Sequence, residues 1–169
     1  MARLTGAVLV ALLALLILSV TPAFAFDRGA CEATMLRLIN HARTSRGLGA
    51  VKVHTALDKA ALSHSRDMIA HDYFAHSSYA GASVARRARG AGYSASGWSH
   101  WEVGEVIAWG KSSRGTPEAV FKAWMHSSEH RRIILIKRWR DVGLGTCRGT
   151  FKGLSGVVMY TVDFGRRVQ

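Results

Sequence analysis

The sequence is short of acidic residues and of proline, and both shortages narrow what the protein can be. Eleven Asp and Glu residues stand against 23 Lys and Arg residues, which gives a formal net charge of +12 at pH 7. A basic excess of this size bears on nonspecific partners and says little about the fold. Pro22 and Pro117 are the two prolines, so Pro-rich spacers are excluded. The sequence also lacks internal repeats and low-complexity tracts, which favours one domain.

Cysteine is also scarce, and the sequence has two cysteines, Cys31 and Cys147. Neither lies in a nucleophile motif, which disfavours a catalytic cysteine. In an exported protein an even count favours one disulfide bond, so we predict that Cys31 and Cys147 are bonded. Closing so long a loop contributes about 4–5 kcal/mol in the chain-entropy model. Two buried free thiols are the alternative.

The N-terminal segment has the pattern of a secretory signal peptide. Arg3 precedes an uninterrupted apolar run over residues 7–20, and Ala-Phe-Ala follows at residues 23–25. This pattern predicts cleavage after the second alanine and a secreted protein. An uncleaved membrane anchor is the alternative, because no charged residue follows Arg3 within the segment. Residues 1–25 are therefore predicted as a signal peptide and residues 26–169 as a single domain.

The basic residues gather at residues 86–89 and 131–140, and removal of Arg3 leaves a net charge of +11. Outside a cell, an anionic membrane or an acidic wall polymer suits such clusters. A solvated cationic surface without a partner is the alternative. We expect no specific nucleic-acid partner, and we expect a monomer.

Hydrophobic periodicity predicts an α+β fold. Helices are expected over residues 31–46, from 55, over 83–91 and from 116, and strands over 104–110, 141–147 and 157–164. Thr55 followed by Asp58 resembles a capping box, and Thr116 before Pro117 marks another helix start. His64 shares an apolar helix face, which predicts a core histidine bonded to backbone.

The polar residues of a candidate site come from three segments. Residues 71–78 hold two histidines, two serines and two aromatic residues directly after a predicted helix. Such side chains crowd at a helix end when they have a task or buried partners. Glu105 lies on a predicted strand and His130 follows a later helix. We predict that His76, Glu105 and His130 meet in one cleft.

Short motifs recur from Cys31 to Gly165, and each is weak alone. They are Asn40-x-x-Arg43, residues 60–68, Tyr73–His76, Gly92-Tyr93, Gly104-Glu105, Trp124–Ser127, His130-Arg131, Val142–Gly145 and Asp163–Gly165. In order and spacing they resemble the CAP superfamily, which holds cysteine-rich secretory, antigen-five and plant pathogenesis-related proteins. The resemblance implies an α+β fold of the CAP (SCP-like) type, a three-layer α-β-α sandwich with a small central antiparallel sheet. It also implies a central cleft lined by His76, Glu105 and His130.

The sequence departs from the family pattern at three positions. Val106 and Ile133 stand where the family usually has asparagine, and Ser127 stands where many eukaryotic members have a second cleft glutamate. The first two changes remove polar side chains that would support the cleft.

The predicted cleft allows three interpretations. Two imidazoles and a carboxylate, from His76, His130 and Glu105, can hold a divalent metal such as zinc with an open position. The same residues can instead form a hydrogen-bonded structural cluster. A hydrolase acting on envelope peptides or polysaccharide would use Ser77 or Ser78 as nucleophile with a histidine base. No nucleophile elbow is present.

We therefore favour a secreted binding module over an enzyme. The cleft residues of this module would be His76, Ser77, Glu105 and His130. The family resemblance suggests a lipid-like or cell-envelope ligand, and metal assistance remains an open alternative.

Overall fold

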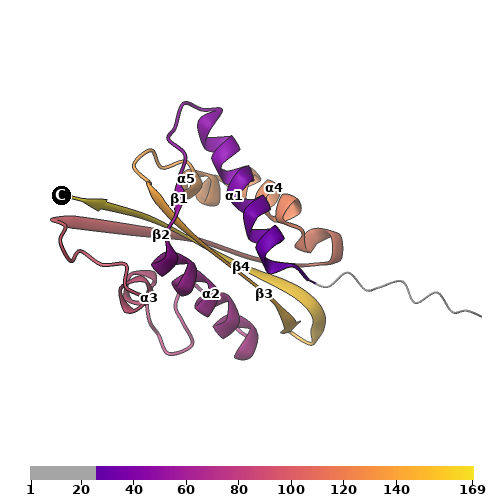
Figure 1. The fold of residues 1–169 in the computed structure, drawn as a ribbon. Coiled ribbons are helices and arrows are strands. Elements are labelled where there is room, and N and C mark those ends of the chain that lie inside the picture. Colours follow the sequence, from indigo (N-terminus) through magenta and orange to yellow (C-terminus); the bar gives the residue numbers. More distant parts are fainter. Residues whose placement is uncertain (1–25) are drawn as a thin grey trace, which may run out of the picture.

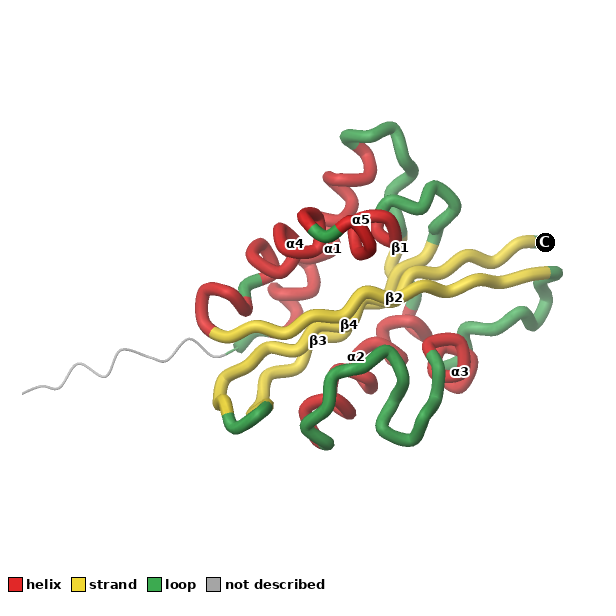
Figure 2. Tube along the Cα trace, turned by 180° about the vertical axis from the view of Figure 1, so that it is seen from behind, coloured by secondary structure: helices red, strands yellow, loops and turns green. Residues whose placement is uncertain are grey.

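The chain folds into three layers, with a central sheet between two groups of helices (Figure 1). The structure is a computed structural model and describes residues 26–169. The predicted signal peptide and its cleavage site lie outside the described residues. Helices α1, α4 and α5 cover one face of the sheet, and α2 and α3 cover the other (Figure 2). The predicted α-β-α sandwich is confirmed.

The elements follow one another in an order close to the predicted one. The helices are α1 (Arg28–Thr44), α2 (Thr55–Ala70), α3 (Val84–Gly90), the 3-10 helix η1 (Ser112–Gly115), α4 (Pro117–His126) and α5 (Ser128–Ile134). The strands are β1 (Lys52–Val53), β2 (His100–Lys111), β3 (Asp141–Phe151) and β4 (Leu154–Val168). No helix within residues 26–169 is long and apolar enough to cross a membrane.

The sheet has the strand order β1-β3-β4-β2, so β2 lies at one edge. Strands β2, β3 and β4 are antiparallel, whereas the two-residue β1 pairs with β3 in parallel. Strand β2 pairs with β4 along its whole length, from His100 to Lys111. It is longer than the predicted strand over residues 104–110, because the expected loop before it also joins the ladder.

Two of the short sequence motifs have a clear packing role in the fold. Gly143 and Gly145 lie where helix α2 touches strand β3, and a Cβ at either position would come within 2.1 Å of the α2 backbone. Only glycine allows this approach. Arg43 is fully buried and donates to the carbonyl oxygens of Gly49, Ile134 and Ile136. These hydrogen bonds connect the C-terminal end of α1 to the end of α5 and the residues that follow it.

Of the two helix starts predicted from capping residues, one has the expected cap and the other does not. Thr116 caps α4 by accepting from the Ala119 amide, as predicted. The predicted capping box at Thr55 is wrong, because the ring of His54 caps α2. The carboxylate of Asp58 accepts instead from the backbone amide of Leu144 on β3, at 2.7 Å.

The predicted disulfide is also wrong, because Cys31 and Cys147 are free thiols on opposite faces of the sheet. Cys31 on α1 lies 3.2 Å from the hydroxyl of Tyr160. Thr146 faces α1 as well, since it bonds Glu32 through its amide and hydroxyl. Successive residues of a strand point to opposite faces, so Cys147 points toward α2. Burial raises the pKa of both thiols.

Candidate functional site

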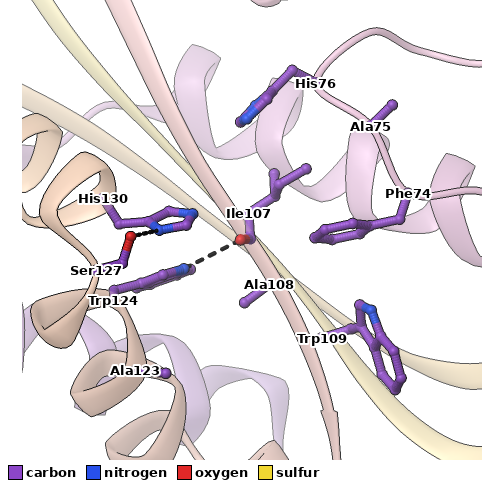
Figure 3. Close-up of a pocket in the computed structure, with 10 residues that line it drawn as sticks. All are labelled: Phe74, Ala75, His76, Ile107, Ala108, Trp109, Ala123, Trp124, Ser127 and His130. Atoms are coloured by element: carbon purple, nitrogen blue, oxygen red, sulfur yellow. Dashed lines mark hydrogen bonds between the residues drawn. The ribbon is translucent and has the colours of Figure 1, made fainter.

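A cavity of about 430 Å³ opens along the free edge of β2, between the α2–α3 loop and helices α4 and α5. Its walls are largely apolar, with two imidazoles and one hydroxyl added, and Figure 3 shows them as Phe74, Ala75, His76, Ile107, Ala108, Trp109, Ala123, Trp124, Ser127 and His130. An apolar cleft with few polar groups is the usual form of a small-molecule site. We call this cavity the cleft.

His76 lies on one wall of the cleft and is fixed by a buried carboxylate. Its Nδ1 is 2.7 Å from Oε1 of Glu105, whose side chain is 1% exposed. The second oxygen of Glu105 accepts from the guanidinium of Arg87 on α3. Arg87 also donates to the carbonyl oxygen of His76. The hydrogen bond to Glu105 raises the pKa of His76.

A second buried acid, Asp163, lies next to this group. Asp163 on β4 stands opposite Glu105 in the ladder, is fully buried, and has no hydrogen-bond partner for either carboxyl oxygen among the described residues. Desolvation, followed by the charge of Glu105, raises its pKa well above the ordinary value. Burial and the neighbouring carboxylate therefore both favour the neutral form of Asp163.

His64 completes the buried group, in the role predicted for it. Its Nε2 lies 2.9 Å from the carbonyl oxygen of Ala75 and 3.9 Å from Glu105 Oε2. Desolvation lowers its pKa. His64 is a core histidine bonded to backbone, as expected from its apolar helix face.

His130 lies on the opposite wall from His76 and is held by its own helical turn. Its Nδ1 is 2.8 Å from the hydroxyl of Ser127, and its ring stacks on Trp124 at 6.5 Å between centroids. Trp124 is fixed in turn, because its indole donates to the carbonyl oxygen of Ile107 at 3.2 Å (Figure 3). Desolvation lowers the pKa of His130.

The predicted residues are therefore divided between the cleft and its support. His76 and His130 line the cleft, whereas Glu105 lies beneath and orients His76. Ser77 is exposed and is not among the residues that line the cleft. Ser78 caps its own loop by accepting from the Ala82 amide. Neither serine is placed beside a histidine base by the described contacts.

A metal held by all three predicted ligands does not fit this arrangement. Both oxygens of Glu105 are taken by His76 and Arg87, and the described residues contain no group of three His, Cys, Asp or Glu side chains that could hold an ion. The two imidazoles keep nitrogen atoms that such an ion could use. Each ring uses Nδ1 for its support, which leaves both Nε2 atoms for a ligand, and a carboxylate behind a ligating histidine is a common arrangement.

Four residues of the site were missed by the sequence reasoning. Arg87 was one of several arginines in a basic helix, and Asp163 was part of a short motif without a role. Ser127 was seen as the loss of a glutamate, although it holds His130. Trp109 was only one residue of a predicted strand, but it is 37% exposed on the edge strand β2 and lines the cleft.

Comparisons with known proteins agree with this fold. The uncharacterized protein YkwD of Bacillus subtilis (strain 168) is 34% identical over 116 residues, which are 69% of this chain and 42% of that protein. This chain thus spans about two fifths of the length of that relative. An extracellular SCP-domain protein from Bacillus anthracis has the same fold, with a TM-score of 0.67 and 22% identity over 82% of this chain and 41% of that one.

An outer surface protein from Borrelia burgdorferi also has this fold, with a TM-score of 0.68 and 18% identity over 84% of this chain and 96% of that one. At these identities the structures establish the fold alone. A model of the cysteine-rich secretory protein family, by contrast, matches the sequence itself over residues 36–164. Since that match covers more than half of the chain, the protein belongs to the cysteine-rich secretory protein (CAP) family.

Proposed function

We propose that the protein is a binding module that takes a lipid-like or other amphipathic cell-envelope molecule in the cleft. The observation that carries this proposal is the composition of the walls. Phe74, Trp109 and Trp124 offer apolar surface, and the two imidazoles add polar groups on facing walls. A cleft of about 430 Å³ is within the usual range for a small ligand. An apolar chain with one polar group matches this division.

We also propose that the protein works outside the cell. The N-terminal apolar run and its Ala-Phe-Ala end support export. The relative from Bacillus anthracis is described as extracellular and the one from Borrelia burgdorferi as an outer surface protein. A cell-envelope ligand would be within reach of a protein at that location.

Filling the cleft tests the proposed binding. Ala123 is exposed on α4 and lines the cleft, so Ala123→Trp is expected to block an apolar ligand while costing little stability. The measurement is titration with a medium-chain fatty acid, followed by tryptophan fluorescence, with an expected loss of affinity of at least tenfold. Ala70→Trp is the matched control, because Ala70 is exposed at the end of α2 and lines no described cavity. Equal affinity in both variants would contradict binding in the cleft.

A second proposal is that a divalent transition metal binds between His76 and His130, with Glu105 as the orienting group. Imidazole suits zinc, copper or nickel better than calcium or magnesium. When bound, such an ion would supply a Lewis acid at the polar end of the cleft. His76 and His130 would each contribute Nε2, and the Glu105 carboxylate would hold the His76 ring in its orientation.

Thermal unfolding with and without zinc tests the metal proposal. Binding to the folded state alone should stabilise the wild type by about 2.7 kcal/mol at a hundredfold excess over Kd. His76→Ala and His130→Ala should each abolish this zinc-dependent rise. His126→Ala is the control, since His126 is exposed and lies outside the cleft lining. Because Glu105 raises the pKa of His76, protons should compete with zinc already above about pH 6.5. A wild type without a zinc-dependent shift would end this proposal.

A further inference from the structure

The end of β2 and the β3–β4 hairpin lie at the same end of the sheet (Figures 1 and 2). Trp109 also lines a neighbouring cavity of about 520 Å³, together with Lys111, Arg114 and Leu154. Lys111 in turn lines a polar hollow of about 610 Å³ that includes Arg148. We call these five residues the hairpin-end surface. It is continuous with the mouth of the cleft.

The hairpin-end surface carries positive charge without partners. Lys111, Arg114 and Arg148 form no ion pair within residues 26–169, and no acidic residue lines either hollow. Asp72 does contact the hairpin, but its carboxylate accepts from the backbone amide of Lys152 at 2.6 Å. Some arginines elsewhere do form ion pairs, such as the two that bind Glu102. The free charge at this end is therefore available to an anionic partner.

The same surface exposes two large apolar side chains among these cations. Trp109 is 37% exposed and Leu154 is 42% exposed. Trp109 is held in place, because its ring packs edge-on against buried Phe151 at 5.2 Å. Tryptophan is enriched at the boundary between lipid and water, where one side of the ring is apolar and the other wet. Lys and Arg stems can cross such a boundary and place their charges on phosphates.

We propose that the hairpin-end surface docks on an anionic lipid bilayer. Trp109 and Leu154 enter the interface, and Lys111, Arg114 and Arg148 meet the headgroup phosphates. The mouth of the cleft then faces the membrane, so an amphipathic molecule passes from the bilayer to the cleft without crossing water. An acidic wall polymer is the weaker fit, because it would use the cations and leave the two apolar side chains in water. Docking goes beyond ligand binding in the cleft and can be tested apart from it.

Vesicle flotation with the full chain tests the charge part of this proposal. Vesicles of phosphatidylcholine with phosphatidylglycerol should bind the protein, and vesicles of phosphatidylcholine alone should bind it much less. Lys111→Gln with Arg148→Gln should weaken binding to the anionic vesicles roughly 30-fold, from about 1 kcal/mol for each basic residue near the surface. The matched control is Lys59→Gln with Arg86→Gln, which has the same net charge and lies on α2 and α3. Equal losses in the two double variants would overturn a specific docking surface.

The apolar part separates a membrane from a polymer. Leu154 lines no part of the cleft, so Leu154→Gln should weaken vesicle binding about fivefold and leave binding of a fatty acid in the cleft unchanged. The same variant should bind soluble poly-glutamate as well as the wild type does. If Leu154→Gln leaves vesicle binding intact while the Lys111 and Arg148 changes weaken vesicle and polymer binding alike, the surface takes acidic polymers and the membrane proposal is wrong. These vesicle measurements do not depend on whether Ala123→Trp blocks fatty-acid binding in the cleft, so the two proposals can fail separately.

Discussion

Glu105→Ala is expected to lower the free energy of unfolding by about 3–5 kcal/mol, a large part of the stability of an ordinary domain. The side chain of Glu105 is 1% exposed, and that of its partner Arg87 is 9% exposed. Removing the carboxylate takes away the ion-pair partner of the guanidinium, and balancing that charge with buried Asp163 instead carries the cost of ionising Asp163. The Nε atom of Arg87 already lacks a partner. His76 loses its orienting hydrogen bond at the same time. Urea unfolding followed by circular dichroism measures the loss.

Glu102 provides a matched control on the same strand. Like Glu105 it has three basic partners, here His100, Arg138 and Arg166, but it is 22% exposed and these partners are more exposed still. Exposed pairs contribute between about 0 and 1 kcal/mol, so Glu102→Ala should cost little. Equal costs at the two positions would contradict the argument from burial.

A double variant separates the ion pair from the packing around it. Glu105→Leu combined with Arg87→Met removes both charges and keeps apolar volume, so it should be less destabilising than Glu105→Ala alone. Its cost should also be well below the sum of the two single changes. If the stability loss of the double variant equals the sum of the two single losses, Glu105 does not stabilise the charge of Arg87.

Much of this architecture can be predicted from the sequence, because it depends on local patterns. The periodic helices, the Thr116 cap and the order of the motifs give the three-layer fold and bring His76 and His130 to one cleft. These features are set by residues a few positions apart, or by a resemblance that covers most of the chain.

The remaining features depend on how distant segments are aligned. The contact between Glu105 and Asp163 exists because β2 and β4 pair in one particular register, and no local pattern specifies that register. The disulfide prediction was wrong for a related reason. Counting thiols gives their number, whereas the face toward which Cys147 points depends on strand alternation within the finished sheet, and the face that carries Cys31 depends on where α1 packs.

Asp163→Asn is expected to leave stability unchanged in acid and to raise it as the pH increases. Asparagine has the shape of the neutral acid that the buried site favours. The pKa of Asp163 is raised well above its ordinary 3.8 by desolvation and by Glu105. The folded protein therefore retains a proton that the unfolded chain releases above about pH 4. Between these two pKa values the wild type loses about 1.4 kcal/mol per pH unit from this group. The Asp163→Asn variant has no titrating group at this position, so its stability does not fall in this way.

The comparison with the wild type isolates Asp163 from the histidines. Buried His64 has a lowered pKa and weakens the fold in acid, whereas His76 has a raised pKa and strengthens it there. Both contributions are common to the two proteins and cancel to a first approximation. Urea unfolding at a series of pH values from about 4 to 8 should show the stability difference growing with pH. A variant that is less stable than the wild type throughout would mean that Asp163 is ionised and required.

The sign of this effect should reverse when Glu105 loses its charge. In Glu105→Gln, Arg87 loses the carboxylate that it binds, and Asp163 is a buried acid within its electrostatic reach. Asp163 should then ionise and pair with the guanidinium, whose Nε is buried without a partner. Asp163→Asn, which stabilises the wild type at neutral pH, should destabilise the Glu105→Gln protein at the same pH. A double-mutant cycle at pH 7 measures this reversal. If Asp163→Asn changes the stability in the same direction in the wild type and in Glu105→Gln, Asp163 does not replace Glu105 as the partner of Arg87. The charge of Arg87 is then balanced by another group.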